Sequence, residues 1–346
     1  VGTSKTRILL GFLLSTALLS MWISNTATAL MMLPMATAIL SNIESESNSK
    51  FPIFLLLTVA YGASIGGMAT LVGSPPNIQM AGLLEEAHGI SISFFDWMRI
   101  GLPISMAMLL LVFGFFYLMM GEERRHELHA AKSVRKKWNA NQLRVVVLFL
   151  TVVFLWAFRK PLTDYTGLTY TDEGVAVFGA IVLFFLPSTE NKPLLEWRDT
   201  SKISWGILIL FGGGMALASM LGQNGVIDQL AGTFANFNGA SLFVLLIVLV
   251  TIAIFGTELM SNLALVSVLV PVVAEFALDT EFSIIQLCLP ITLASSCAFM
   301  LPVGTPPNAI VFSSGKLTIN QMARTGFVLN LIGVLVVVLL SILLIH

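Results

Sequence analysis

The segment WISNTATALMMLP, residues 22–34, places the polar triplet Ser-Asn-Thr between two apolar runs, residues 8–23 and 27–40. As helices these runs of 16 and 14 residues would reach roughly 21–24 Å, which is short of the ~30 Å hydrocarbon core of a bilayer. Two short arms joined by a polar turn predict a re-entrant hairpin, residues 8–40, whose tip lies at mid-membrane depth.

A second short polar motif follows the predicted hairpin inside apolar sequence, and we call this motif and the Ser-Asn-Thr triplet polar words. It reads GSPPN, residues 73–77, and begins 49 residues after Ser24. Proline has no N–H and displaces the carbonyl one turn earlier, so the spanning segment 51–84 is predicted to be a broken helix. Irregular backbone is tolerated at membrane depth only where it is buried in protein or lines a cavity.

Both words occur a second time in the same order. Ser-Asn-Leu-Ala at 261–264 is the turn of a second predicted hairpin, 241–277, and GTPPN at 304–308 begins 43 residues after Ser261 inside the predicted broken helix 282–315. A duplicated pair of interruptions is typical of the two repeats of a secondary transporter and points to its binding site.

The composition agrees with an all-α polytopic membrane protein. The chain has 346 residues, of which 56% are hydrophobic and 11% are charged, a balance that ordinary soluble domains do not reach. The net charge of −1 and the lack of a basic groove or base-stacking pattern give no indication of a nucleic-acid partner. Cys288 and Cys297 lie in apolar sequence, which is typical of small core hydrophobes rather than of a disulfide.

The distribution of Lys and Arg predicts the orientation in a cell inner (plasma) membrane. The basic segment 121–144 is expected on the cytoplasmic side, and the acidic loop 85–99 and the C-terminus outside. Five predicted crossings separate the hairpins, so the second enters from the opposite side to the first. This arrangement is an inverted repeat.

The predicted organisation has four parts. Residues 1–120 and 236–346 are the two transport-domain parts, each made of a hairpin, a broken helix and a final helix, 100–120 or 325–345. Residues 121–142 form a cytoplasmic interfacial helix, and 143–235 hold three scaffold helices, at 143–158, 173–187 and 203–222. Nothing precedes the first hairpin, so about 100 residues of scaffold sequence are expected to be missing from the N-terminus.

The polar words predict two kinds of ligand. Ser-Asn-Thr at the start of an outgoing half-helix offers hydroxyl, amide and free N–H groups to a carboxylate, sulfate or phosphate. The carbonyls freed near Gly73 and Gly304, together with side-chain oxygens, suit an alkali cation. Ser20 and Thr257 lie four residues before Ser24 and Ser261 and face the same side. An ordinary N-cap and a proline kink without a ligand are the alternatives, and the duplication argues against both.

These words, with their order and spacing, closely resemble the divalent anion/sodium symporter family, and WISNTATALMMLP and MLPVGTPPNAIVF are specific strings. The resemblance implies a homodimer with separate scaffold and transport domains and an elevator-like movement. It implies one sodium site at Ser20, Ser24, Asn25 and the Gly73 carbonyl, and another at Thr257, Ser261, Asn262 and the Gly304 carbonyl. A small dicarboxylate would meet Asn25, Thr26, Ser74, Asn262 and Thr305.

One departure from the family pattern affects the choice of substrate. Leu263 stands where the first triplet has the hydroxyl of Thr26, and one lost hydrogen bond to an anion costs about 1 kcal/mol. Sulfate symport, which Leu263 favours, tricarboxylate symport and sodium-independent exchange are the alternatives to sodium–dicarboxylate symport, and the intact oxygen ligands at both expected cation sites argue against exchange. An intramembrane enzyme is disfavoured because all four histidines fall in predicted loops or termini, and paired hairpins suit alternating access better than a channel.

Three further groups of residues admit a structural interpretation. Glu258, next to the second tip, is predicted with equal weight to be functional or a salt-bridged structural residue. His126, His129, Glu122 and Glu123 could imitate a metal cluster but fit a solvated interfacial helix better. The glycines of helical segments indicate close helix packing rather than a phosphate loop; they are Gly62, Gly66, Gly67 and Gly212–Gly214.

Overall fold

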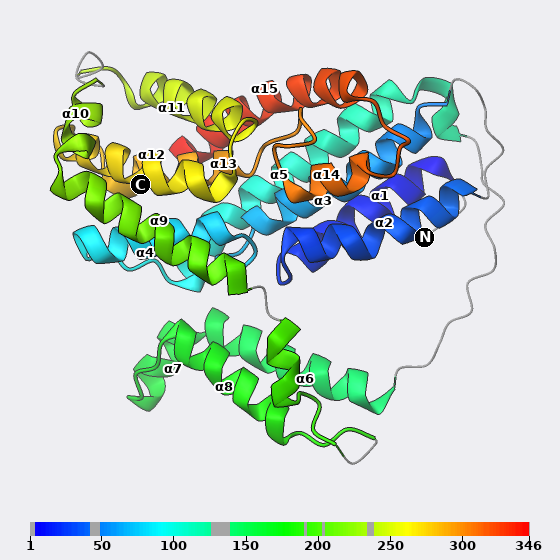
Figure 1. Ribbon diagram of the computed structural model, residues 1–346, viewed down its shortest axis with the longest axis horizontal. Coiled ribbons are helices and arrows are strands. Elements are labelled where there is room, and N and C mark those ends of the chain that lie inside the picture. Colours follow the sequence, from blue (N-terminus) through cyan, green and yellow to red (C-terminus); the bar gives the residue numbers. More distant parts are fainter. Residues whose placement is uncertain are drawn as a thin grey trace. The chain divides into compact units, whose positions relative to one another are not determined.

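The computed structural model describes residues 4–41, 49–125, 139–189, 192–202, 205–233 and 239–345. In these ranges the regular elements are helices (Figure 1). The chain divides into two compact units. The first comprises Val1–Ile92, Asp96–Ala130 and Ile209–His346, and the second comprises Ser93–Phe95 and Ala131–Leu208. The predicted scaffold segment is thus divided between the two units near residue 208.

Both predicted hairpins are pairs of helices joined by a short turn. The first consists of α1 (Lys5–Ser20) and α2 (Asn25–Ser41) and is drawn in blue, and the second of α11 (Leu242–Thr257) and α12 (Asn262–Leu278) (Figure 1). Each Ser-Asn word lies at the turn, and its asparagine is the first residue of the outgoing helix.

Both predicted broken helices are interrupted at the polar words. The first is α3 (Phe51–Met68) followed by α4 (Pro75–His88), and the second is α13 (Ile284–Ser295) followed by α14 (Pro306–Phe312). The two prolines open α4 and α14, where a missing N–H costs nothing.

The second break begins earlier than the sequence predicts. The sequence places the interruption of the segment 282–315 at GTPPN, residues 304–308, but α13 already ends at Ser295. Pro302 cannot donate to a carbonyl four residues earlier and disfavours helical backbone at residue 301. Side chains from other helices take up the N–H groups that this longer break leaves free, as described below.

The two hairpin and broken-helix pairs interlock within the first unit. The first half of each broken helix packs on its own hairpin, α3 on α1 and α2, and α13 on α11 and α12. The second half packs on the other hairpin, α4 on α12 and α14 on α2. Because each broken helix packs on both hairpins, the two breaks are held together within the first unit.

Glycine allows the closest helix contacts, as predicted for α3. A Cβ at Gly66 would overlap the backbone of Ala17 in α1, and one at Gly62 would lie 3.0 Å from the Leu13 carbonyl oxygen. The prediction is wrong for Gly212 and Gly213, beside which a Cβ would find open space. Gly214 alone of that run is in a close contact, 2.5 Å from the Ser267 hydroxyl.

Long apolar helices accompany these pairs. Among the described residues, α3, α5 (Phe94–Met119), α6 (Ala140–Ala157) and α15 (Ile319–Leu344) are long and apolar enough to cross a membrane. The first unit also contains α10 (Val226–Thr233), which the sequence did not predict, and most of α9 (Trp205–Gln223). The predicted interfacial helix 121–142, with its histidines, falls mainly outside the described residues.

Glu123 in the short helix η1 (Gly121–Arg125) joins three elements of the first unit. Its carboxylate accepts from the Ser49 hydroxyl at 2.7 Å and the Lys50 N–H at 3.1 Å, and lies 3.7 Å from Lys5 Nζ. Burial raises the pKa of Glu123, but these hydrogen bonds and the positive charge outweigh burial and lower it. The residue is therefore an anchor between the starts of α1 and α3 and the end of α5.

The second unit contains α6, α7 (Arg159–Thr166), α8 (Asp172–Phe185) and η2 (Trp197–Lys202). Its central polar residue is Asp172, which pairs with Arg159 at 3.0 Å and accepts from the Phe94 N–H at 2.8 Å. The short helix α7 was not predicted, because its polar sequence carries no spanning signal.

We expect Gly66→Ala to lower the apparent melting temperature of the detergent-solubilised protein, measured by tryptophan fluorescence. The added methyl group meets the backbone of α1 rather than a flexible side chain, and overpacking of this kind costs about 1–3 kcal/mol. Gly114→Ala is the matched control, since a Cβ there finds open space within α5. Equal melting temperatures for the two variants would contradict the close α1–α3 contact.

Candidate functional site

The first hairpin tip brings four oxygen atoms together. The Ser20 hydroxyl at the end of α1 lies 2.7 Å from both the Asn25 Oδ1 and the carbonyl oxygen of Ala63 in α3. The same Asn25 oxygen faces the Gly73 carbonyl at 3.3 Å and the Ala63 carbonyl at 3.1 Å. Ser20, Asn25 and Gly73 were predicted to lie together, and the structure places them so.

The contacts of Asn25 leave two physical solutions. An amide oxygen cannot be held by three other oxygens when only the Ser20 hydroxyl carries a proton. If the carboxamide is reversed, its Nδ2 donates to Ser20, Ala63 and Gly73. If it is not reversed, a cation among the four oxygens provides the missing attraction, as hard oxygen ligands do for alkali ions.

Gly67 allows the Asn25 side chain and the Gly73 carbonyl to come close to each other. A Cβ at Gly67 would lie 2.5 Å from the Asn25 Oδ1 and 3.1 Å from the Gly73 carbonyl oxygen. The predicted packing glycine is therefore also the residue that leaves room for the cluster of oxygens.

The second tip repeats the geometry. The Thr257 hydroxyl lies 2.7 Å from the Asn262 Oδ1 and 3.0 Å from the carbonyl oxygen of Ser295. Thr257 and Asn262 correspond to Ser20 and Asn25, and the Ser295 carbonyl takes the place of the Ala63 carbonyl. Gly304 lies beside Glu258, since a Cβ there would be 2.9 Å from the Glu258 Oε2.

The serines of the two words are helix N-caps. The Ser24 hydroxyl accepts from the Ala27 N–H at 3.3 Å, and the Ser261 hydroxyl accepts from the Ala264 N–H at 3.1 Å. The alternative interpretation of these serines as caps is therefore confirmed, although a capping oxygen keeps a lone pair for a second contact. Their predicted role as cation ligands stays a prediction.

The asparagines of the two proline words hold the breaks together. Asn77 Nδ2 donates to the carbonyls of Gly67 and Thr70 at 2.9 and 2.8 Å. Asn308 Nδ2 donates to those of Ala298 and Leu301 at 2.9 and 3.0 Å. Each amide spans the same two positions, ten and seven residues earlier in the chain. Some of the carbonyls at the two breaks are thus bound by side chains of the protein rather than left for a cation.

Glu258 holds the longer second break. Its carboxylate is 3% exposed and accepts from the N–H groups of Met300 and Leu301 at 2.7 and 2.9 Å. Asn330 in α15 donates to the same carboxylate at 2.8 Å and accepts from the Phe299 N–H at 3.3 Å. Glu258 is therefore a structural residue, but it binds backbone and amide N–H groups where a salt bridge was considered.

The substrate residues predicted beside the tips differ in exposure. Asn25, Thr26 and Asn262 are partly buried, whereas Ser74 and Thr305 are buried at 1% and 4% exposure. The Thr305 hydroxyl caps α14 by accepting from the Asn308 N–H. Leu263 is buried at 6% exposure, so the second tip presents one hydroxyl fewer than the first.

A cavity of about 440 Å³ lies elsewhere, between α4, α9, α10 and α12. Its lining includes His88, Ser219 and Glu275. None of the predicted ligand residues lines it, so the chemistry of the two tips is independent of this cavity.

Comparison with known proteins identifies the family. Residues 1–345 match the family model described as the sodium:sulfate symporter transmembrane region. The chain belongs to this family. A Staphylococcus saprophyticus protein named sodium-dependent dicarboxylate transporter SdcS is 36% identical, over 98% of this chain and 69% of that protein. A protein of the same name from Staphylococcus aureus strain USA300 is 33% identical over the same shares.

Membership of this symporter family makes the chain a multi-pass membrane transporter and excludes the enzyme interpretation. The resemblance read from the two pairs of polar words is thereby confirmed.

Several residues of this symporter's site were missed from the sequence. The carbonyls of Ala63 and Ser295 give no sequence signal, because any residue supplies one. Asn77 and Asn308 did give a signal, since both proline words end in the same residue. Their side-chain oxygens were counted among the possible cation ligands, and only the structure shows that each amide nitrogen donates to two carbonyls.

We expect Asn308→Asp to destabilise the protein strongly. A carboxylate cannot donate to the carbonyls of Ala298 and Leu301, and a buried acceptor left unsatisfied costs about 1–3 kcal/mol. The exposed Asn224, whose amide donates only to the Met220 carbonyl, offers the matched control Asn224→Asp. Thermal unfolding in detergent should separate the two variants clearly, and similar melting temperatures would refute the bracing role of Asn308.

The variant Asn25→Asp distinguishes the two arrangements of Asn25, a reversed carboxamide or a cation among the oxygens. If a cation lies among the oxygens, the variant keeps the oxygen ligand and its melting temperature rises when sodium chloride replaces choline chloride. If the amide donates, the carboxylate of the variant meets the two carbonyl oxygens of Ala63 and Gly73 with only the Ser20 hydroxyl able to donate to it, and the variant is destabilised whichever salt is present.

Proposed function

We propose that this symporter couples the entry of sodium ions to the uptake of a small dicarboxylate of the succinate, malate or fumarate type. The observation that carries the proposal is the matched polar cluster at each tip. The first gathers the Ser20 hydroxyl, the Asn25 carboxamide and the carbonyls of Ala63 and Gly73, and the second gathers the Thr257 hydroxyl, the Asn262 carboxamide and the Ser295 carbonyl. Each cluster offers hard, uncharged oxygen ligands of the kind that bind sodium. Sodium is thus a co-transported substrate.

The choice of a dicarboxylate as substrate is supported by the location of the two tips at helix N-termini. Asn25 and Asn262 open α2 and α12, where free N–H groups and the helix dipole attract an anion. Two such helix starts, one from each half, suit the two carboxylates of one small molecule. The named relatives are sodium-dependent dicarboxylate transporters, which agrees with this choice.

Sulfate is the second candidate. It is named in the family description, and the buried Leu263 leaves the second tip short of one hydroxyl donor. Tricarboxylate symport and sodium-independent exchange remain the alternatives that a transport assay distinguishes.

The proposed movement is an elevator-like displacement of a transport domain against a scaffold within a homodimer. The interlocked halves α1–α5 and α11–α15 would form the moving part, because each broken helix packs on both hairpins. We propose that the first hairpin opens to the cytoplasm, the second opens outside, and the C-terminus is external.

The test is uptake of labelled succinate into proteoliposomes with and without an inward sodium gradient, with unlabelled sulfate and citrate as competitors. We expect saturable, sodium-dependent uptake that Asn25→Ala reduces at least tenfold and that the exposed control Asn224→Ala leaves unchanged. Sodium-independent uptake stimulated by internal succinate would replace the proposal with exchange. Uptake of sulfate alone would favour the second candidate.

A further inference from the structure

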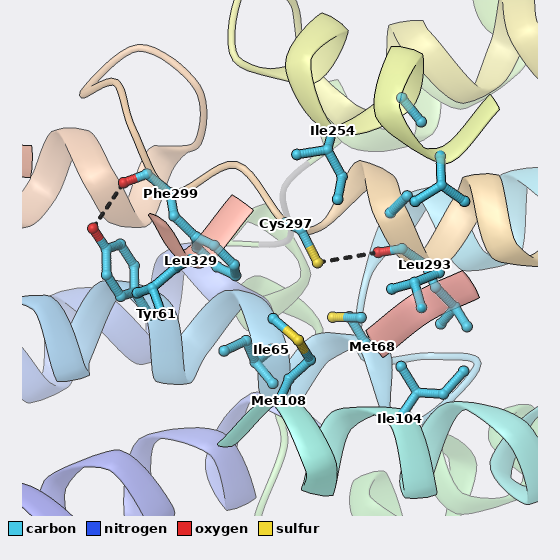
Figure 2. Packing of buried hydrophobic residues seen from close by; sticks show 14 of the residues in the cluster. Tyr61, Ile65, Met68, Ile104, Met108, Ile254, Leu293, Cys297, Phe299 and Leu329 are labelled. Atoms are coloured by element: carbon cyan, nitrogen blue, oxygen red, sulfur yellow. Dashed lines mark hydrogen bonds between the residues drawn. The ribbon is translucent and has the colours of Figure 1, made fainter. Parts of the chain in front are cut away.

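One hydrogen bond joins the first half of the chain to the backbone of the second break. The Tyr61 hydroxyl in α3 donates to the Phe299 carbonyl at 2.7 Å, and both side chains are fully buried (Figure 2). The two rings lie against each other with centroids 4.8 Å apart. Phe299 belongs to the unwound segment between α13 and α14, so Tyr61 fixes a backbone group that has no helical partner.

The same helix carries a ligand group of the first tip. Ala63, two residues after Tyr61, presents the carbonyl that lies 2.7 Å from the Ser20 hydroxyl. A change that fixes Ala63 at the first tip therefore also fixes Tyr61. On the other side of the contact, Phe299 lies four residues after Ser295, whose carbonyl faces Thr257 at the second tip.

The residue at the equivalent position of the second half does not make this connection. Tyr61 precedes Asn77 by 16 residues, and the residue that precedes Asn308 by the same number is Thr292. The Thr292 hydroxyl donates to the Cys288 carbonyl within its own helix, at 3.0 Å. The bridge is therefore a feature of α3 and is not imposed by the internal repeat.

We propose that Tyr61 is a positioning residue that couples the two cation sites, so that sodium at the first tip strengthens sodium binding at the second. The inference builds on the proposed function. A cation among the oxygens of Ser20, Asn25 and Ala63 fixes α3, and Tyr61 then holds the segment that carries Phe299. The second cation meets a segment that is already ordered, which lowers the conformational entropy lost on binding.

The test is hydrogen–deuterium exchange of the purified transporter, measured by mass spectrometry on peptides covering residues 296–305 at increasing sodium concentration without substrate. This segment carries the N–H groups of Phe299, Met300 and Leu301, which are bonded to side chains. Its exchange therefore reports opening near the second tip, separately from transport activity.

We expect Ser20→Ala, which alters only the first tip, to raise the sodium concentration that half-protects 296–305 about fivefold or more. Tyr61→Phe should raise it as well, and adding Ser20→Ala to Tyr61→Phe should then change nothing further. Ser105→Ala is the matched control, because the Ser105 hydroxyl donates to the Ile65 carbonyl of α3 at 2.8 Å but stays within the first half. It should preserve the effect of Ser20→Ala.

Two results would overturn the coupling while leaving sodium binding intact. One is an equal effect of Ser20→Ala with and without the Tyr61 hydroxyl, and the other is no effect of Ser20→Ala on 296–305 in the unmodified protein. If sodium protects neither tip of the unmodified protein, the proposed function fails together with the coupling. Loss of coupling in Ser105→Ala would assign the effect to general loosening of α3 and refute the role of Tyr61.

Discussion

The structure depends on how backbone groups are satisfied at two helix breaks that lie in apolar surroundings. An unpaired N–H or carbonyl buried away from water costs about 1–3 kcal/mol, and each break exposes several. Asn77 and Asn308 each satisfy two carbonyls with one amide, and Glu258 satisfies two N–H groups of the longer break. Without these side chains the breaks could not persist inside the protein.

The residues that hold the breaks, Asn77, Asn308 and Glu258, are different from the residues proposed to bind ligands. We call these three the bracing residues. The bracing side chains are buried, and the amide N–H groups of Asn77 and Asn308 and the carboxylate of Glu258 bond to the backbone, whereas Asn25 and Asn262 lie partly exposed at the tips. Because Asn77 holds the first break, the Gly73 carbonyl is not needed to stabilise the break and can lie next to Asn25.

Both halves contain a hairpin and a broken helix, but the polar contacts at their breaks differ. These differences follow from single residues. Met21 and Glu258 both follow a tip hydroxyl residue, but only the second half has the longer break whose N–H groups need a carboxylate. Ser105 and Asn330 likewise each contact a broken helix from the helix that ends their half, through a hydroxyl in one case and a carboxamide in the other. An internal duplication therefore predicts where polar contacts occur and does not predict which partners make them.

The sequence by itself determined the helical membrane class, the two hairpins, the two broken helices and the family, because turn words such as SNTA and GTPPN stand out against apolar runs. The family resemblance carried by these motifs also implied that Ser20 lies with Asn25 and Thr257 with Asn262. Only the tertiary structure decided that Glu258 binds backbone N–H groups and that Tyr61 reaches Phe299. These contacts join residues from 42 to 238 positions apart, and packing between helices, which leaves no local signal, brings them together.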